Sequence, residues 1–159
     1  MKRKLLAWFC AGLTALSLTA CASVSEEKLL QNGETWDAAF TEALLADAAD
    51  PDTLEEEYVG REIIAGTNSG LWVYEITEEG MVIMPGPASN GNVALGGVFS
   101  DTDLAQIDLN DQISIAGVIA GIEAMEGGGV AVVLSPVFLV ENFGTDDLGI
   151  LEQSNPSGE

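Results

Sequence analysis

The sequence predicts a mainly β domain: a five-stranded barrel with an N-terminal helix and a short helix between strands 3 and 4. Two observations lead to this class. After residue 58, short runs of apolar and β-branched residues follow one another, separated by clusters rich in Gly, Pro and Asn. Before residue 58, large apolar residues instead recur every four positions, as they do on one face of a helix.

The N-terminal helix is expected over Glu34–Ala49. Trp36, Phe40 and Leu44 lie four residues apart within it, and carboxylates occupy the other faces. The sequence Asp50-Pro51-Asp52 is expected to end this helix, because proline breaks the hydrogen-bond pattern of a helix interior. One further helical turn is expected before the first strand.

Five strands are expected in the second half of the chain. The first is interrupted by the Thr67-Asn68-Ser69-Gly70 cluster, which indicates a bend or bulge. Five strands with a helical insert between the third and the fourth form the arrangement of an OB-fold, a small barrel. The expected strands are Arg61–Thr77, Met81–Met84, Val93–Phe99, Gln112–Ile122 and Gly129–Val140.

Three stretches are similar to a known family. They are "YVGREIIAG" (Tyr58–Gly66), "LAQIDLNDQISIAGVIAG" (Leu104–Gly121) and "VAVVLSPVFLV" (Val130–Val140). They resemble the first strand, a later block and the closing strand of the tRNA-anticodon-binding-like (tRNA_anti-like) OB-fold family. Asn110-Asp111 departs from that family's Gly-Asp turn. The resemblance implies an OB-like barrel in a small bacterial lipoprotein or envelope protein, and it implies no site residue.

The chain begins with the features of a bacterial lipoprotein signal. Lys2-Arg3-Lys4 precedes an apolar run over Leu5–Leu18, and Leu18-Thr19-Ala20-Cys21 looks like a lipobox. The motif implies a diacylglycerol on the Cys21 thiol and an N-acyl chain on the new amine, which together anchor a protein stably. An ordinary signal peptide with a chance cysteine is the alternative.

The expected location is therefore the cell membrane, with the protein lipid-anchored and facing outside the cytoplasm. If the organism is Gram-negative, the expected place is the periplasmic face of the outer membrane. The expected organisation is a signal peptide over 1–20, a lipidated tether over 21–33, an N-terminal helical segment over 34–57, an OB-like barrel over 58–141 and an acidic, disordered tail over 142–159.

Acidic side chains strongly outnumber basic ones. There are 26 Asp and Glu against five Lys and Arg, and three of the basic residues precede Cys21, so the lipidated chain has a formal charge of 2 − 26 = −24. Such a surface repels nucleic acid, and the second and third strands carry no Lys or Arg, so nucleic acid is not expected as a partner. The same acidity is also typical of proteins that stay soluble at high salt.

The residue inventory argues against catalysis. The chain has no histidine, and its two cysteines are Cys10 and Cys21. This excludes Ser-His, Cys-His and histidine-metal sites from the barrel. No enzyme activity and no cofactor are expected, apart from the covalent lipid on Cys21. A carboxylate pair acting on a glycoside stays as a less favoured alternative.

The segment "DTDLAQIDLND" is the most site-like stretch. An EF-hand loop would need an Asp or Asn, a Gly and a Glu where the chain has Ala105, Gln106 and Gln112. The favoured interpretation is therefore structural: a capped short helix, its solvated face and a turn into the fourth strand. Weak candidates for a metal site remain Asp101, Asp103, Asp108 and Asp111.

An aromatic pattern lies in the first strand. Trp72, Tyr74 and Ile76 alternate with Leu71 and Val73, so the two sets occupy opposite strand faces. The favoured interpretation places one set in the barrel core and the other under the N-terminal helix. If the helix does not cover it, the aromatic face becomes a docking site.

These features predict a lipid-anchored cell-envelope protein that acts as a non-catalytic binding or adaptor module. The expected partners are the membrane, through the lipid, and an envelope protein. The alternative is an envelope protein that binds divalent cations or cationic ligands with its acidic surface.

Overall fold

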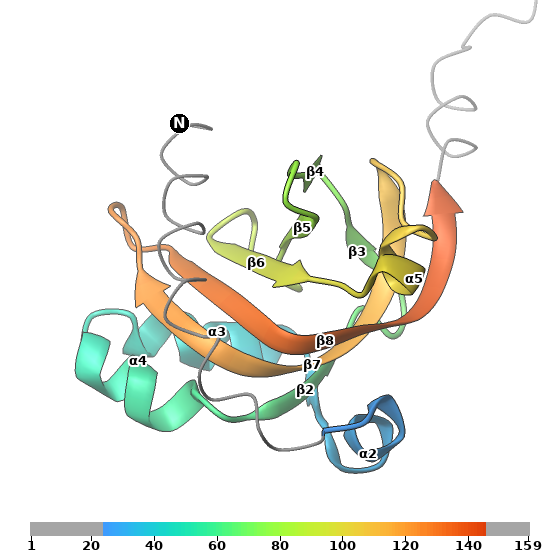
Figure 1. The fold of residues 1–159 in the computed structure, drawn as a ribbon. Coiled ribbons are helices and arrows are strands. Elements are labelled where there is room, and N and C mark those ends of the chain that lie inside the picture. Colours follow the sequence, from blue (N-terminus) through green and yellow to red (C-terminus); the bar gives the residue numbers. More distant parts are fainter. Residues whose placement is uncertain (1–23, 146–159) are drawn as a thin grey trace, which may run out of the picture.

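The structure, a computed structural model, describes residues 24–145 and consists of one sheet with helices against it (Figure 1). The helices are α2 (Glu26–Asn32), α3 (Ala38–Asp47), α4 (Pro51–Tyr58) and α5 (Asp101–Leu104). The strands are β1 (Glu34–Trp36), β2 (Glu62–Ala65), β3 (Leu71–Trp72), β4 (Glu75–Ile76), β5 (Met81–Pro85), β6 (Val93–Val98), β7 (Asp111–Ala124) and β8 (Val130–Thr145).

The strands form a single sheet in the order β1-β2-β7-β8-β6-β5-β4, and β3 pairs with β7 beside that path. Pairing is parallel between β1 and β2 and between β6 and β8, and antiparallel elsewhere. The prediction of a mainly β fold is confirmed. The sheet has eight strands and is not closed, so the predicted five-stranded OB barrel is not confirmed.

The predicted first strand, 61–77, is divided into β2, β3 and β4. Its first interruption is a bend bounded by Gly66 and Gly70, whose φ angles are 78° and 70°. Glycine adopts this left-handed conformation without a clash involving a Cβ, which explains why the strand can turn there. The Thr67-Asn68-Ser69-Gly70 cluster thus forms the bend that the sequence predicts.

Backbone hydrogen bonds continue past these short strands. The Val73 N–H donates to the Asp111 carbonyl at 2.8 Å, and the Tyr74 N–H donates to the Ile83 carbonyl at 3.1 Å. Within the segment 71–76, Val73 therefore bonds to β7, and the next residue, Tyr74, bonds to β5. This arrangement fixes the position of the strand that carries the aromatic side chains.

The N-terminal helix is shorter than the sequence predicts. Glu34–Trp36 forms β1 and pairs with Ile63–Ala65, which removes these residues from the expected helix. Asp37 then caps α3, because its Oδ1 accepts from the Phe40 N–H at 3.0 Å. The expected pattern of burial is present: the exposed fraction is 2% for Trp36, 7% for Phe40 and 0% for Leu44.

The segment expected to end the helix starts a new one. Asp50 is the N-cap of α4, and its Oδ1 accepts from the Asp52 N–H at 3.2 Å. Pro51 occupies the first helical position, where its missing N–H costs nothing. Figure 1 shows α3 and α4 lying together beside β2 and β7.

Part of the expected tether is also helical. Residues 26–32 form α2, and Leu29 is fully buried where this helix meets β2 and β7. At the other end, β8 includes residues 142–145 of the expected tail. The signal peptide, Cys21 and residues 146–159 lie outside the described residues, so the predicted domain boundaries stay predictions.

Two groups of apolar side chains hold the sheet. Val82 and Met84 of β5 belong to the larger core, which extends under α3 and α4. The neighbouring side chains of the same strand point to the other side, as the two-residue period of a strand requires. They belong to a smaller cluster made of Met81, Ile83, Ala94, Ala131 and Val133.

Candidate functional site

The short helix predicted between the third and fourth strands is present as α5. The Ser100 Oγ accepts from the Asp103 N–H at 3.2 Å, which caps the helix, and Asp101 lies exposed in its first turn. The Asp103 Oδ2 in turn accepts from the Leu139 N–H at 3.2 Å. One candidate carboxylate therefore attaches α5 to β8.

A second candidate carboxylate is buried. Asp111 is 6% exposed, and its Oδ2 accepts from the Asp108 N–H at 2.8 Å and from the Asn142 amide at 2.7 Å. The same amide donates to the Gln106 carbonyl at 2.6 Å. The carboxylate thus fixes the turn into β7 against β8.

The four aspartates do not gather around a common point as a ligand set. Within residues 24–145, no three His, Cys, Asp or Glu side chains are placed to hold a metal ion. Asp103 and Asp111 use an oxygen on protein donors, and Asp101 lies exposed in the first turn of α5. Asp101, Asp103, Asp108 and Asp111 stay weak candidates, and the contacts of Asp103 and Asp111 are structural.

The two basic side chains of the described region are engaged in ion pairs. The Lys28 Nζ lies 3.7 Å from the Glu62 carboxylate, and the Arg61 Nη1 lies 3.8 Å from the Glu34 carboxylate. The Arg61 guanidinium also lies over the Tyr58 ring, 4.8 Å from its centroid. Both cations therefore serve the fold around α2, α4 and β2.

A groove on the surface is a different kind of site. It has a volume of about 490 Å³ and lies between β1, the bend at 66–70, β3 and the loop after β5. Its walls combine aromatic, proline and uncharged polar side chains. Lining residues include Thr35, Asp37, Asn68, Trp72, Pro87 and Gln112. We call this the Trp72 groove.

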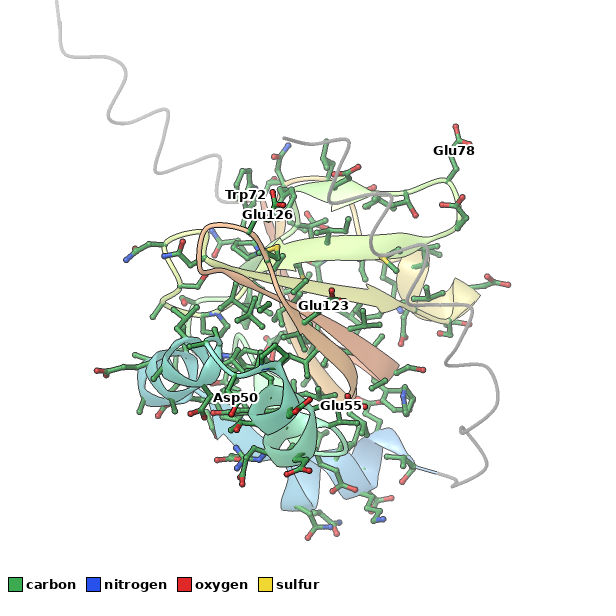
Figure 2. All side chains as sticks on the ribbon, turned by 90° about the vertical axis from the view of Figure 1, so that its left-hand side faces the viewer. Asp50, Glu55, Trp72, Glu78, Glu123 and Glu126 are labelled. Atoms are coloured by element: carbon green, nitrogen blue, oxygen red, sulfur yellow. The ribbon has the colours of Figure 1, made fainter. Side chains whose placement is uncertain are left out.

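Trp72 forms the aromatic wall of the groove. Its side chain is 50% exposed, while its neighbours Leu71 and Val73 are buried at 4% and 0%. The N-terminal helix does not cover Trp72, so the interpretation that placed its strand face beneath that helix is wrong for this residue. Figure 2 shows the side chain at the surface, far from α4.

Two contacts hold the Trp72 ring in place. Its Nε1 donates to the Asn110 Oδ1 at 3.3 Å, and the Tyr74 ring lies 6.0 Å away between centroids. Burial raises the pKa of the Tyr74 hydroxyl, and the nearby charge of Glu75 adds to this effect. The Trp72 ring is therefore held in place by Asn110 and Tyr74, while half of its surface stays exposed.

The opposite wall is fixed from within the core. The buried Trp36 Nε1 donates to the Thr41 Oγ1 at 2.8 Å, and that hydroxyl donates to the Pro87 carbonyl at 2.6 Å. This chain attaches the loop after β5 to the start of α3. In the same loop, Ala88 has a left-handed φ of 51°, which costs about 1–2 kcal/mol for a residue with a Cβ.

The sequence identifies separate parts of this site, but it does not show that they lie together in the fold. Trp72 and the bend at 67–70 are both visible as local signals. Thr35 and Pro87 join them only because β1 pairs with β2 and because Thr41 binds the loop. These contacts are long-range, and no local spacing encodes them.

No family model matches the chain, and no curated protein matches it either. A solved structure resembles it: the crystal structure of a "putative nucleic acid-binding lipoprotein" from Klebsiella pneumoniae subsp. pneumoniae. The two chains share 11% identity with a TM-score of 0.52, over 75% of this chain and 100% of that one. The likeness shows a shared fold alone. The fold is therefore one that a lipoprotein also has, whereas the resemblance to the tRNA-anticodon-binding-like family is not confirmed.

This comparison corrects one expectation. Nucleic acid was excluded as a partner from the net charge and from the composition of two strands, but a structure with this fold is described as nucleic acid-binding. Net charge averages over a surface, whereas binding depends on local chemistry, and base stacking requires only an accessible aromatic face. The exclusion of nucleic acid is therefore withdrawn.

Among residues 24–145, every helix is too short or too polar to cross a membrane. The predicted anchor, Cys21, lies outside this range.

Proposed function

We propose that this protein is a lipid-anchored, non-catalytic binding module of the cell envelope and that the Trp72 groove is its ligand site. The observation that carries the proposal is the half-exposed Trp72, held by Asn110 beside a concave, largely uncharged surface. Tryptophan is among the residue types most enriched at the anchor positions of binding surfaces. The groove brings uncharged polar groups to the same place.

An OB-like barrel is the finer fold that we propose for the domain. Two features support it: β6 pairs in parallel with β8, and the segment 71–76 bonds to β7 and to β5. In an OB-like barrel, the long first strand would join these two sides of the sheet in the same way.

The anchor is proposed from the sequence. Leu18-Thr19-Ala20-Cys21 supports acylation of Cys21, which would hold the domain at a membrane outside the cytoplasm, at the outer membrane in a Gram-negative cell. Labelling of cells with radioactive palmitate should mark the protein and should fail for Cys21→Ser. Equal labelling of both would refute the anchor without bearing on the groove.

The binding role is tested with matched variants in the envelope. Proteins or other molecules cross-linked to the wild type should be lost in Trp72→Ala and retained in Phe143→Ala. Phe143 is a suitable control because it is 47% exposed and does not line the groove. Identical cross-linking of the two variants would refute the groove as the ligand site.

Two other candidates each rest on an observation. Single-stranded nucleic acid is supported by the description of the structural neighbour and by the exposed Trp72. A divalent or cationic ligand is supported by the 22 carboxylates among residues 24–145. Calorimetry with calcium tests the second, since an absence of saturable heat at millimolar ion would eliminate it.

A further inference from the structure

We propose that the Trp72 groove binds an uncharged glycan. This inference rests on the proposed function and specifies the ligand class of the same groove. Three properties of the site favour such a ligand: the kind of polar groups in its walls, the charge around it and its rigid aromatic wall.

The polar groups of the groove are hydroxyls and amides. They come from three separate parts of the chain: β1, the bend at 66–70 and the start of β7. Their side chains are exposed or half-buried, so their donors and acceptors are accessible to a ligand. Hydroxyls and amides both donate and accept, as the hydroxyls of a sugar do. The groups are Thr35, Thr67, Asn68, Ser69 and Gln112.

The charge at the groove favours a neutral ligand over an anion. Asp37 is the one ionised side chain among the lining residues, and neither Lys28 nor Arg61 lines the groove. Both cations are paired with carboxylates elsewhere on the domain. A phosphate or carboxylate ligand would meet no compensating positive charge there.

Asp37 itself fits the recognition of a polyhydroxylated ligand. Its Oδ1 is occupied by the N–H of Phe40, which holds the carboxylate at the start of α3. The other oxygen of this exposed side chain is free for a hydroxyl donor. A hydrogen bond from a hydroxyl to a carboxylate is stronger than one between neutral groups.

Trp72 supplies a flat apolar wall. A sugar ring presents polar hydroxyls at its edge and C–H groups on its faces, so it can stack on an aromatic ring while its edge bonds to polar groups. The negatively charged face of an indole ring suits such C–H groups. Both walls are held in place before a ligand binds. Trp72 contacts Asn110 and Tyr74, and on the opposite wall Thr41 donates to the Pro87 carbonyl. This preorganisation lowers the entropic cost of binding.

The test uses the full-length lipoprotein, purified from membranes in detergent. Calorimetry measures the binding of chitotetraose, maltotetraose and a single-stranded thymidine oligonucleotide to the wild type, Trp72→Ala and Phe143→Ala. At least one neutral oligosaccharide should bind the wild type. Its affinity should fall by roughly tenfold or more in Trp72→Ala, as expected for an aromatic anchor, and stay unchanged in Phe143→Ala.

Three results would overturn the inference. They are the absence of saturable heat with either oligosaccharide at millimolar concentration, oligosaccharide binding with unchanged affinity in Trp72→Ala, and binding of the oligonucleotide alone. Oligonucleotide binding that depends on Trp72 would leave the groove as the ligand site, so this failure is distinct from failure of the proposed function. Co-sedimentation with purified cell-wall polymer and flotation with glycolipid vesicles then separate the two sources of envelope glycan.

Discussion

Tyr58 shows how burial controls a single titratable group. The side chain is 3% exposed, and its hydroxyl donates to the Asp47 Oδ2 at 2.8 Å. Burial first, and then this hydrogen bond, raise the pKa of Tyr58 from 10.0 to about 12. The folded protein therefore keeps a proton that the unfolded chain loses above pH 10. Stability from this group is complete below pH 10 and falls as the pH rises toward 12.

The variant Tyr58→Phe should separate the hydrogen bond from the packing. Phe keeps the contacts with the Phe40 ring and Arg61, so the free energy of unfolding near neutral pH should fall by only about 1 kcal/mol. Between pH 10 and about 12, the variant should lose less stability than the wild type. Urea denaturation across this range measures both effects. Tyr74→Phe is the control for the hydrogen bond near neutral pH, because it removes a hydroxyl that has no bond to Asp47.

Asp111 is the candidate metal ligand whose structural role is clearest. In Asp111→Ala, the Asp108 N–H and the Asn142 amide lose their acceptor, which should cost about 2 kcal/mol of unfolding free energy. Asp101→Ala, at an exposed position, should change it by no more than about 0.5 kcal/mol. Thermal unfolding with and without calcium measures both. Equal losses, or a calcium-dependent loss in Asp111→Ala, would contradict the structural role.

At the scale of elements, the bend between β2 and β3 depends on close backbone approach. A Cβ on Gly66 would lie 2.5 Å from the Ile113 carbonyl oxygen, and φ is 78° there. Gly60 has a similar φ of 92°, but a Cβ there would meet nothing within 4 Å. The pair thus separates backbone strain from steric exclusion.

We expect Gly66→Ala to be clearly more destabilising than Gly60→Ala. Gly60→Ala should cost about 1 kcal/mol from its left-handed backbone alone, whereas Gly66→Ala must also move β7. Chemical denaturation of both variants measures the difference. Similar losses would show that the bend can move away from β7 without cost, and the wall of the Trp72 groove would then be less rigid than described.

The elements also show what the sequence could predict. Periodicity placed the five main strand regions and the short helix at 101–104, because alternation and capping are local signals. It missed β1, since Glu34–Trp36 lies within a four-residue pattern and becomes a strand only by pairing with Ile63–Ala65. It also took Pro51 for a stop, although proline is equally suited to the first turn of a helix.

The candidate site was predictable to the same extent. The alternation along the first strand identified Trp72 as a member of an aromatic face. Whether that face is covered depends on where α3 packs, and α3 packs mainly against β1 and α4. The groove therefore required the tertiary arrangement, whereas the residue that anchors it did not.

At the scale of the whole molecule, the described residues carry 22 carboxylates and two cations, a formal charge of 2 − 22 = −20. Three of these carboxylates, Glu55, Glu56 and Glu57, lie in succession on the exposed side of α4. Because two ion pairs offset so little of this charge, mutual repulsion opposes the compact state. Figure 2 shows the labelled carboxylates of Asp50, Glu55, Glu78, Glu123 and Glu126 distributed over separate parts of the molecule.

Screening should therefore stabilise the protein. An increase from about 0.1 M to 1 M sodium chloride shortens the Debye length from about 10 Å to 3 Å and should raise the melting temperature by a few degrees. The variant Glu55→Gln, Glu56→Gln, Glu57→Gln should start with a higher melting temperature and gain less from salt. Calcium chloride at matched ionic strength separates screening from binding. If repulsion alone is responsible, both salts act equally, whereas a larger, saturable shift with calcium would favour the cation-binding function over the groove.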